Sequence, residues 1–348
     1  MSALAARMVA SRLFWPVVML LVLFTINVIA FPGFFTVSIR DGNLYGSLID
    51  ILRNGAPTLI VAVGMTLVIA TRGIDLSVGA VCAISGAVAC SILLGSPDPS
   101  NPATVAVAIA TALVISLVLG LWNGLLIAVV GIQPIIATLI LMTAGRGIAM
   151  LITEGQILTV DSPPFKALGS GFWGGIPIAV IIAAVIFAVA AVLTRRTALG
   201  MLIESVGINP EASRQAGVRA RGLLFAVYTF SAFCAGIAGL ILTANTTAAD
   251  ANSTGLFIEL DAILAVVIGG TSLAGGRYSL AGTLIGALVI QTLVTTVYTV
   301  GIPPIATMVF KAAVVTAVCL LQSPTTNDAL ASFRRRLAAR AGKAPVTS

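Results

Sequence analysis

The chain has 348 residues, of which 59% are hydrophobic and only 9% are charged, and its mean hydropathy is +1.11. About a quarter of the residues of a soluble domain are charged, so this composition excludes a soluble protein and predicts a membrane protein. The formal net charge of +7 would suit nucleic-acid binding, but basic cytoplasmic loops and tails explain it better, and we expect no nucleic acid as a partner.

Apolar segments follow one another along the chain, separated by short polar or turn-rich stretches. A helix needs roughly 20 apolar residues to span a membrane, so the length accommodates about ten spans. The first segment, residues 13–30, resembles a signal peptide but is longer than the usual apolar core, so we expect a retained span. The other predicted spans are residues 57–70, 78–94, 103–130, 134–152, 176–193, 223–244, 257–273, 280–300 and 305–321.

The loops between these spans are mostly short. The largest external loops are predicted at residues 36–56 and 153–175, and a smaller one at residues 245–255. Residues 194–222, called here the polar loop, contain five arginines and should be cytoplasmic, because Lys and Arg are enriched on that side. These arginines are Arg195, Arg196, Arg214, Arg219 and Arg221.

A short helix is predicted inside the polar loop. Asn209 suits the N-cap, Pro210 the first helical position and Glu211 the first turn. Gly217 can end the helix in a left-handed conformation. A helix of about two turns is not stable alone in water, so something else must hold it.

The remaining charges predict the topology. Most basic residues fall on the cytoplasmic side, with Arg40, Arg53 and Lys166 as the main exceptions. An even number of spans with both termini in the cytoplasm is therefore predicted. Residues 1–322 are interpreted as the membrane domain, and residues 323–348 as a disordered, basic cytoplasmic tail.

Two segments far apart in the chain have a similar pattern. Residues 69–79 and 268–282 both interrupt an apolar run with Gly, Ser or Thr and charge. Paired interrupted helices indicate a transport pathway built from repeats. We therefore predict an all-α membrane bundle of about ten transmembrane helices with two pseudo-symmetric halves.

Polar residues inside the spans are candidates for a translocation path, because burying them in a membrane is costly. Asp75 could instead cap the helix that begins near Leu76. Arg146 could bind substrate hydroxyls, or it could reach the membrane interface or pair with Glu154. The candidates are Asp75, Ser77, Asn123, Gln133, Thr138 and Arg146.

The sequence indicates no catalytic or metal site. The chain has no histidine, the commonest general base and metal ligand. Glu259 and Asp261 are two residues apart, which places them on different faces of a helix and argues against a hydrolytic pair. Lys311 lies inside the last span and needs a carboxylate or carbonyl partner that the sequence does not identify.

The four cysteines lie in apolar segments without the spacing of a metal site, and we interpret them as small buried side chains. A disulfide between Cys82 and Cys90 is the alternative. The set is Cys82, Cys90, Cys234 and Cys319.

The run LAGGR at residues 273–277 resembles the signature loop of ABC-type ATPases. The chain has no GxxxxGK[ST] phosphate loop, and the run lies in a turn between two spans. We therefore expect this chain to bind no nucleotide or other cofactor.

Four collinear motifs resemble the membrane permeases of bacterial sugar ABC importers of the ribose and xylose type, and the resemblance covers residues 13 to about 322. Within that family, the stretches LGMLIESVGIN and ADAN look closest to the galactofuranose permeases. The four motifs are GIDLSVG (73–79), QPIIATLILMTAGRG (133–147), VGINPEASRQAG (206–217) and LDAILAVVIGGTSLAGG (260–276).

The resemblance implies a multi-pass subunit of the bacterial inner membrane, without catalytic activity of its own. Its implied partners are a cytosolic ABC ATPase that binds ATP and Mg, a periplasmic sugar-binding protein, and a second permease subunit, identical or paralogous. It implies that residues 204–217 dock on the ATPase. The residues of interest there are Glu204, Gly207, Asn209, Pro210, Glu211, Arg214 and Gly217.

Two other functions remain open at this point. An ion-coupled secondary transporter would need intramembrane carboxylates such as Asp75 and Glu259 to titrate. A membrane enzyme acting on a lipid-linked sugar would need acidic or histidine catalysis, which the sequence does not favour.

Overall fold

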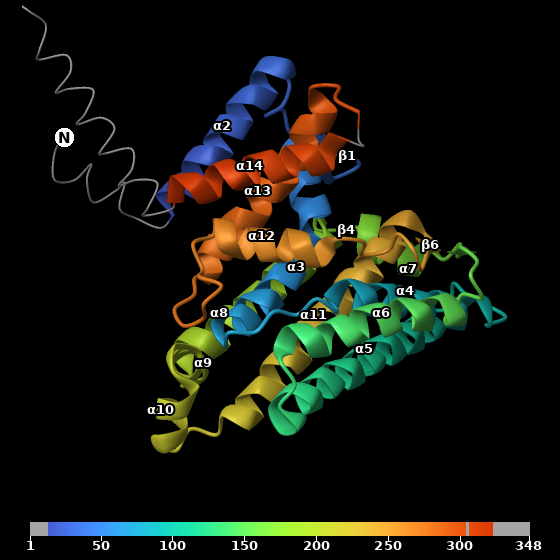
Figure 1. Ribbon diagram of the computed structural model, residues 1–348. Coiled ribbons are helices and arrows are strands. Elements are labelled where there is room, and N and C mark those ends of the chain that lie inside the picture. Colours follow the sequence, from blue (N-terminus) through green and yellow to red (C-terminus); the bar gives the residue numbers. More distant parts are fainter. Residues whose placement is uncertain (1–12, 304–305, 323–348) are drawn as a thin grey trace, which may run out of the picture.

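Helices account for most of the structure, and the expected all-α membrane bundle is confirmed. The computed structural model describes residues 13–303 and 306–322 (Figure 1). The segment before residue 13, with Arg7 and Arg12, and the proposed tail at 323–348 lie outside the described residues. The boundary between membrane domain and tail therefore stays a prediction.

The helices follow the predicted spans closely. They are α2 (Phe14–Ala30), α3 (Ser47–Ala70), α4 (Val78–Leu94), α5 (Pro102–Leu125), the π-helical turn η1 (Leu126–Val130), α6 (Pro134–Ile152), α7 (Pro163–Ser170), α8 (Ile178–Arg196), α9 (Leu199–Ile208), α10 (Pro210–Gln215), α11 (Ala220–Thr246), α12 (Ile258–Ile268), α13 (Leu280–Thr299) and α14 (Thr307–Gln322).

Six of the described helices are long and apolar enough to cross a membrane: α3, α5 with η1, α6, α8, α11 and α13. Three shorter helices, α2, α4 and α9, are also apolar. Several helices therefore have the length and composition of membrane spans, as the sequence predicted.

The expected boundaries of two spans were wrong. Residues 47–56 were assigned to an external loop, but α3 begins at Ser47 and contains Pro57 in its interior. Asp50 and Arg53, which suggested a loop, form an i, i+3 ion pair of 3.4 Å within this helix.

The span expected at residues 257–273 is shorter than predicted. Helix α12 ends at Ile268, because Gly270 takes a left-handed conformation (φ 83°) and its amide bonds back to Val267. An 11-residue helix is about 16 Å long, roughly half of the hydrocarbon thickness.

Three short antiparallel strand pairs lie in the loops: β1 (Ser38–Arg40) with β2 (Asn43–Tyr45), β3 (Leu158–Thr159) with β6 (Ala248–Ala249), and β4 (Phe172–Trp173) with β5 (Ile176–Pro177). The β3–β6 pair joins two loops far apart in sequence, with Leu158 opposite Ala249. The loop expected at residues 153–175 therefore contains α7 and the strands β3 and β4 rather than irregular chain.

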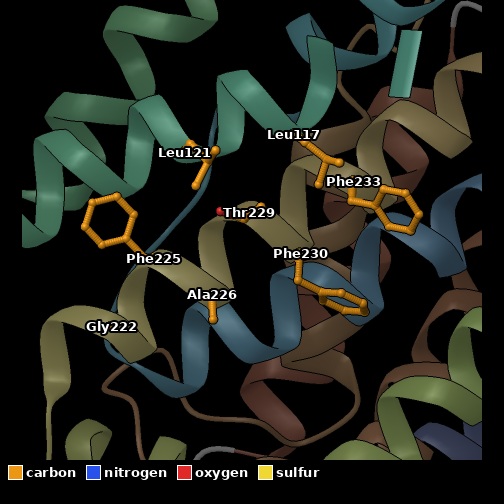
Figure 2. A pocket seen from close by; sticks show the side chains of 8 residues that line it. All are labelled: Leu117, Leu121, Gly222, Phe225, Ala226, Thr229, Phe230 and Phe233. Atoms are coloured by element: carbon orange, nitrogen blue, oxygen red, sulfur yellow. The ribbon is translucent and has the colours of Figure 1, made fainter. Parts of the chain in front are cut away.

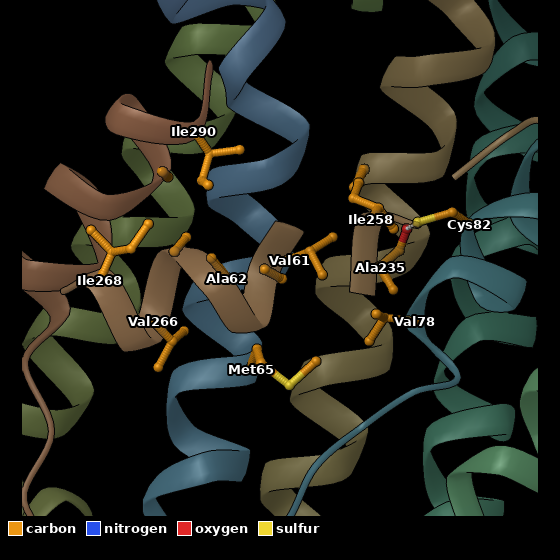
Figure 3. Packing of buried hydrophobic residues seen from close by; sticks show 14 of the residues in the cluster. Val61, Ala62, Met65, Val78, Cys82, Ala235, Ile258, Val266, Ile268 and Ile290 are labelled. Carbon is orange, nitrogen blue, oxygen red and sulfur yellow. Dashed lines mark hydrogen bonds between the residues drawn. The ribbon is translucent and has the colours of Figure 1, made fainter. Parts of the chain in front are cut away.

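Helices α3 and α11 lie at the centre of the bundle, and α5, α6 and α8 lie further out (Figure 1). The largest buried cluster brings together Met65 of α3, Ala235 of α11 and Val266 of α12 (Figure 3). Three cysteines, Cys82, Cys90 and Cys234, are buried and free, so the alternative of a disulfide between Cys82 and Cys90 was wrong.

Candidate functional site

The break between α3 and α4 carries a buried polar cluster. Asp75 is fully buried, and its Oδ1 accepts hydrogen bonds from the amide and the hydroxyl of Ser77, at 3.1 and 2.6 Å. Its Oδ2 accepts a bond of 2.8 Å from the hydroxyl of Ser231 in α11. Asn123 of α5 donates to the Ser77 hydroxyl at 2.9 Å. We call Asp75, Ser77, Asn123 and Ser231 the polar node.

The polar node explains how a carboxyl group can lie inside an apolar bundle. A buried polar group is costly unless it is hydrogen-bonded, and three bonds reach the two oxygens of Asp75. The amide that Asp75 accepts from belongs to Ser77, the residue before α4, so Asp75 fixes the approach to this helix rather than capping one of its free amides.

Two polar atoms beside the node have no hydrogen-bond partner among the described residues. They are Oδ1 of Asn123 and the hydroxyl of Tyr228, and both residues are fully buried. A Cβ added at Gly73 would overlap the Tyr228 hydroxyl, so this hydroxyl lies directly against the interrupted segment. The node therefore keeps unused hydrogen-bonding capacity beside the helix break.

Two further path candidates lie on α6. Thr138 is buried, and its hydroxyl donates to the carbonyl of Ile74 at 3.1 Å, so it contacts the same interrupted segment. Gln133 lies at the start of α6 and is exposed. Four of the six path candidates thus meet around residues 74–77, and Gln133 does not.

Arg146 lies elsewhere, two turns beyond Thr138 on α6. Its Nη1 donates to the carbonyls of Ala251 and Thr254, at 2.9 and 2.7 Å. The suggested pairing with Glu154 was wrong, because Glu154 is an exposed residue in the turn that follows α6. Carbonyl partners in a packed loop hold the half-buried guanidinium instead.

The two carboxylates of α12 point to different partners, as their i, i+2 spacing predicted. Glu259 is buried, and a Cβ added at Gly79 would meet both its carboxylate and the Arg146 guanidinium. Asp261 accepts bonds of 2.8 and 2.7 Å from Nζ of Lys311, the partner that the sequence did not identify. The two carboxylates therefore lie near different basic side chains.

The Asp261–Lys311 pair lies in a groove of about 740 Å³ between α12, α13 and α14. Each side chain of the pair is about 20% exposed. The rest of the lining is mainly apolar and includes Leu260, Leu264 and Met308. This groove combines a half-buried ion pair with an exposed apolar surface.

A second groove, of about 600 Å³, lies between α5 and α11 (Figure 2). Leu117 and Leu121 of α5 and Phe225, Phe230 and Phe233 of α11 line it. Such a lining offers almost no hydrogen bonds to a polar substrate, so this groove suits an apolar occupant rather than a polar small molecule.

The predicted helix of the polar loop is present as α10. Oδ1 of Asn209 accepts a bond of 3.0 Å from the Ala212 amide, and Pro210 is the first helical residue. Gly217 has φ 85°, its amide bonds to the Arg214 carbonyl, and the Val218 amide bonds to the Ser213 carbonyl. These contacts are a Schellman ending, so the predicted start and end of this helix are confirmed.

Glu211 and Arg214 form an exposed bidentate pair on α10, with N–O distances of 3.0 and 2.6 Å. The hydrogen bond and charge of Arg214 lower the pKa of Glu211, and Glu211 raises the pKa of Arg214. Both groups are therefore charged at neutral pH. α10 projects from one end of the bundle with this pair on its surface (Figure 1).

Helix α9 connects α10 to the bundle, and close packing fixes its two ends. Gly207 lies against the Ala70 carbonyl at the end of α3 and the Gly276 amide, and a Cβ there would overlap both. Glu204 and Tyr278 line a polar cavity of about 340 Å³ near the start of α9. The polar loop is therefore joined tightly to the membrane helices.

Ser231 and Tyr228 were missed by the sequence analysis. Both lie in the apolar span of α11, three residues apart and so on one helix face. A serine and a tyrosine sharing one face of a membrane helix indicate a polar contact, but the partner of Ser231, Asp75, lies 156 residues away. Only the tertiary structure identifies this contact.

Comparison with known proteins decides the family. The family model described as "Branched-chain amino acid transport system / permease component" matches residues 47–319. The chain belongs to this permease family. Among solved structures, none matches the chain.

Relatives of the permease are similar over nearly their whole length. The Escherichia coli (strain K12) galactofuranose transporter permease protein is 47% identical over 331 residues, 93% of this chain and 95% of that protein. The Bifidobacterium longum fructose import permease protein is 43% identical over 341 residues, 96% of this chain and 94% of that protein. The Haemophilus influenzae ribose import permease protein is 37% identical over 300 residues, 85% of this chain and 88% of that protein.

Proposed function

We propose that this permease is the transmembrane subunit of an ATP-driven importer for a monosaccharide, either galactofuranose or a related pentose or hexose. The observation that carries the proposal is the 47% identity to a galactofuranose permease over 93% of the chain. Similarity to fructose and ribose import permeases supports the monosaccharide class.

The energy for transport would come from a cytosolic ABC ATPase that binds ATP and Mg. The permease sequence has no phosphate loop, and α10 is a short helix exposed at one end of the bundle. Such a helix needs a partner to be stable, so α10 and the adjoining end of α9 are the proposed docking surface. Its residues are Glu204, Gly207, Asn209, Pro210, Glu211, Arg214 and Gly217.

Sugar would enter from a periplasmic binding protein and leave by alternating access. ATP binding and hydrolysis on the partner move α10, and the membrane helices rock to open the path inward. The polar node with Thr138, together with Gln133 and Arg146, supplies the polar groups proposed for the path. The permease would lie in the bacterial inner membrane with both termini in the cytoplasm.

The groove of α12, α13 and α14 is the proposed contact with a second permease subunit. An ion pair such as Asp261–Lys311 is costly against lipid tails. A second subunit, identical or paralogous, would cover the exposed apolar residues Leu260 and Met308 and keep the pair away from lipid.

Purification and uptake test the proposal. The permease should co-purify with an ABC ATPase, and ATP with a sugar-binding protein should drive uptake of radiolabelled galactose, fructose or ribose into proteoliposomes. Uptake by the permease alone that an ionophore abolishes would instead show an ion-coupled transporter. Sugar turnover by the pure chain would show an enzyme.

Charge reversal on α10 tests the docking surface. Glu211→Arg should abolish uptake at a normal protein level, because it places two arginines side by side where an ion pair lies exposed to the partner. Asp161→Arg is the matched control, since Asp161 is also exposed but lies in the loop before α7. Gly207→Pro should also uncouple transport. Wild-type uptake by Glu211→Arg would contradict this assignment.

A further inference from the structure

Arg72 lies at the point where the polar loop meets the interrupted helix. It follows the end of α3 and has a left-handed backbone conformation, with φ 65°. Its Nη2 donates a hydrogen bond to the carbonyl of Ile208, the last residue of α9. A cation at the carbonyl end of a helix is favourable, because the carbonyls there have no partners within the helix.

Three chain segments meet around this contact. The Gly276 amide, in the loop between α12 and α13, donates to the Ala70 carbonyl at 2.9 Å. Gly207 packs against both of these groups, and the stem of the Arg72 side chain passes directly over Gly275. We call Ala70, Arg72, Gly207, Ile208 and Gly276 the clasp.

The clasp is close in sequence both to α10, the proposed docking helix, and to the polar node, the proposed part of the path. On one side, Ile208 is two residues before Pro210, which begins α10. On the other side, Arg72 is three residues before Asp75 of the polar node, and the Ile74 carbonyl between them accepts a bond from Thr138. Ile208 is therefore linked to the polar node through the short segment from Arg72 to Asp75, in which Gly73 and Asp75 are buried.

We propose that Arg72 is a positioning residue that couples movement of α10 to the interrupted segment at residues 71–77. The left-handed conformation of Arg72 belongs to a Schellman ending of α3, in which the Arg72 amide bonds to the Ile69 carbonyl and the Gly73 amide to the Val68 carbonyl. The Ile208 bond ties this ending to α9. This inference rests on the proposed function, because it assigns the route by which force from the ATPase reaches the proposed path.

The competing explanation is that Arg72 only adds positive charge to a cytoplasmic loop. Arg72→Lys separates the two explanations. Lysine keeps the charge and therefore the topology, but it is shorter and lacks the guanidinium fork, so it does not reach the Ile208 carbonyl from the same backbone position. Arg277→Lys is the matched control, because Arg277 is exposed in the adjoining loop and has no hydrogen bond or ion pair among the described residues.

The experiment measures sugar taken up per ATP hydrolysed by the complete transporter in proteoliposomes, with radiolabelled galactose, fructose and ribose as probes. Arg72→Lys should lower this ratio about tenfold, the expected cost of one charged hydrogen bond, while ATP hydrolysis continues. Arg277→Lys should keep the wild-type ratio. A wild-type ratio for Arg72→Lys overturns the proposal.

A second measurement separates this inference from the proposed function. Hydrogen exchange of the purified permease should show amides at residues 71–77 exchanging about tenfold faster in Arg72→Lys, and not in Arg277→Lys. If the wild-type protein moves no sugar but this difference is present, the proposed function fails and the clasp contact stands. Unchanged exchange in Arg72→Lys overturns the inference on its own.

Discussion

Helices α3 and α8 are both membrane-spanning in length, yet they have opposite environments. Of the most apolar stretch of 18 residues in each helix, 78% is buried in the protein in α3 and only 22% in α8. The outer helix nevertheless has the higher mean hydropathy. Lipid tails are as apolar as a protein core, so apolar side chains are not driven inward here.

What α3 has instead is close packing and internal polar contacts. Its Thr66 hydroxyl bonds to Thr283 of α13 at 2.7 Å, and Gly64 lets α11 approach near Ser231. The segment after α3 carries the polar node. The difference teaches that α3 is held by contacts with other inner helices, while α8 has most of its surface exposed outside the bundle.

The largest effect is expected at the polar node. Asp75→Ala leaves the Ser77 and Ser231 hydroxyls without their acceptor, and should destabilise the permease by about 3 kcal/mol or more. Thermal unfolding of the purified protein in lipid nanodiscs measures this. Asp161→Ala, at an exposed position, is the control. Equal stability of Asp75→Ala and Asp161→Ala would show that the buried contacts of the polar node do not stabilise the inner helices.

A matched pair of valines tests packing alone. Val61 of α3 is fully buried, and Val185 of α8 is 54% exposed. Val61→Ala should cost about 1–3 kcal/mol, because it leaves a cavity between packed helices. Val185→Ala should cost less than about 0.5 kcal/mol, because lipid fills the space. The unfolding midpoints of the two variants, measured under the same conditions, test this difference. Similar losses of stability would mean that α8 is packed against something other than lipid.

The smallest effect is expected on α10, outside the bundle. Glu211→Gln removes an exposed ion pair and should leave the unfolding midpoint unchanged. Because Arg214 lowers the pKa of Glu211 below its ordinary value of 4.5, the pair is complete above that pH and is lost only as the pH falls through the lowered value. The protection of the α10 amides, taken as the exchange rate relative to the intrinsic rate at each pH, should therefore not change between pH 8 and about 5. A change within that range would point to another titrating group.

Features set by neighbouring residues could be predicted from the sequence. The N-cap Asn209, the first helical residue Pro210 and the left-handed Gly217 are local choices, and each lies where expected. Most span boundaries agree within a few residues for the same reason. At α3, Asp50 and Arg53 suggested a loop, because the sequence does not show that they neutralise each other on a helix.

Contacts between distant segments could not be predicted. Asp261 and Lys311 are 50 residues apart, and Asp75 and Ser231 are 156 apart. No periodicity links such pairs, since each depends on how whole helices pack. From the sequence, Asp75, Ser77, Asn123 and Thr138 were separate candidates for the translocation path. Only the structure shows that they lie together. Their roles in transport stay predictions.

The β3–β6 pair has a practical consequence for labelling the permease. An epitope inserted after Thr159 would separate Leu158 and Thr159 from Ala248 and Ala249, and so pull apart two loops that hold each other. Between Pro97 and Asp98 the chain is an exposed turn, the kind of site that tolerates insertion. An epitope placed there would leave the β3–β6 pair uninterrupted.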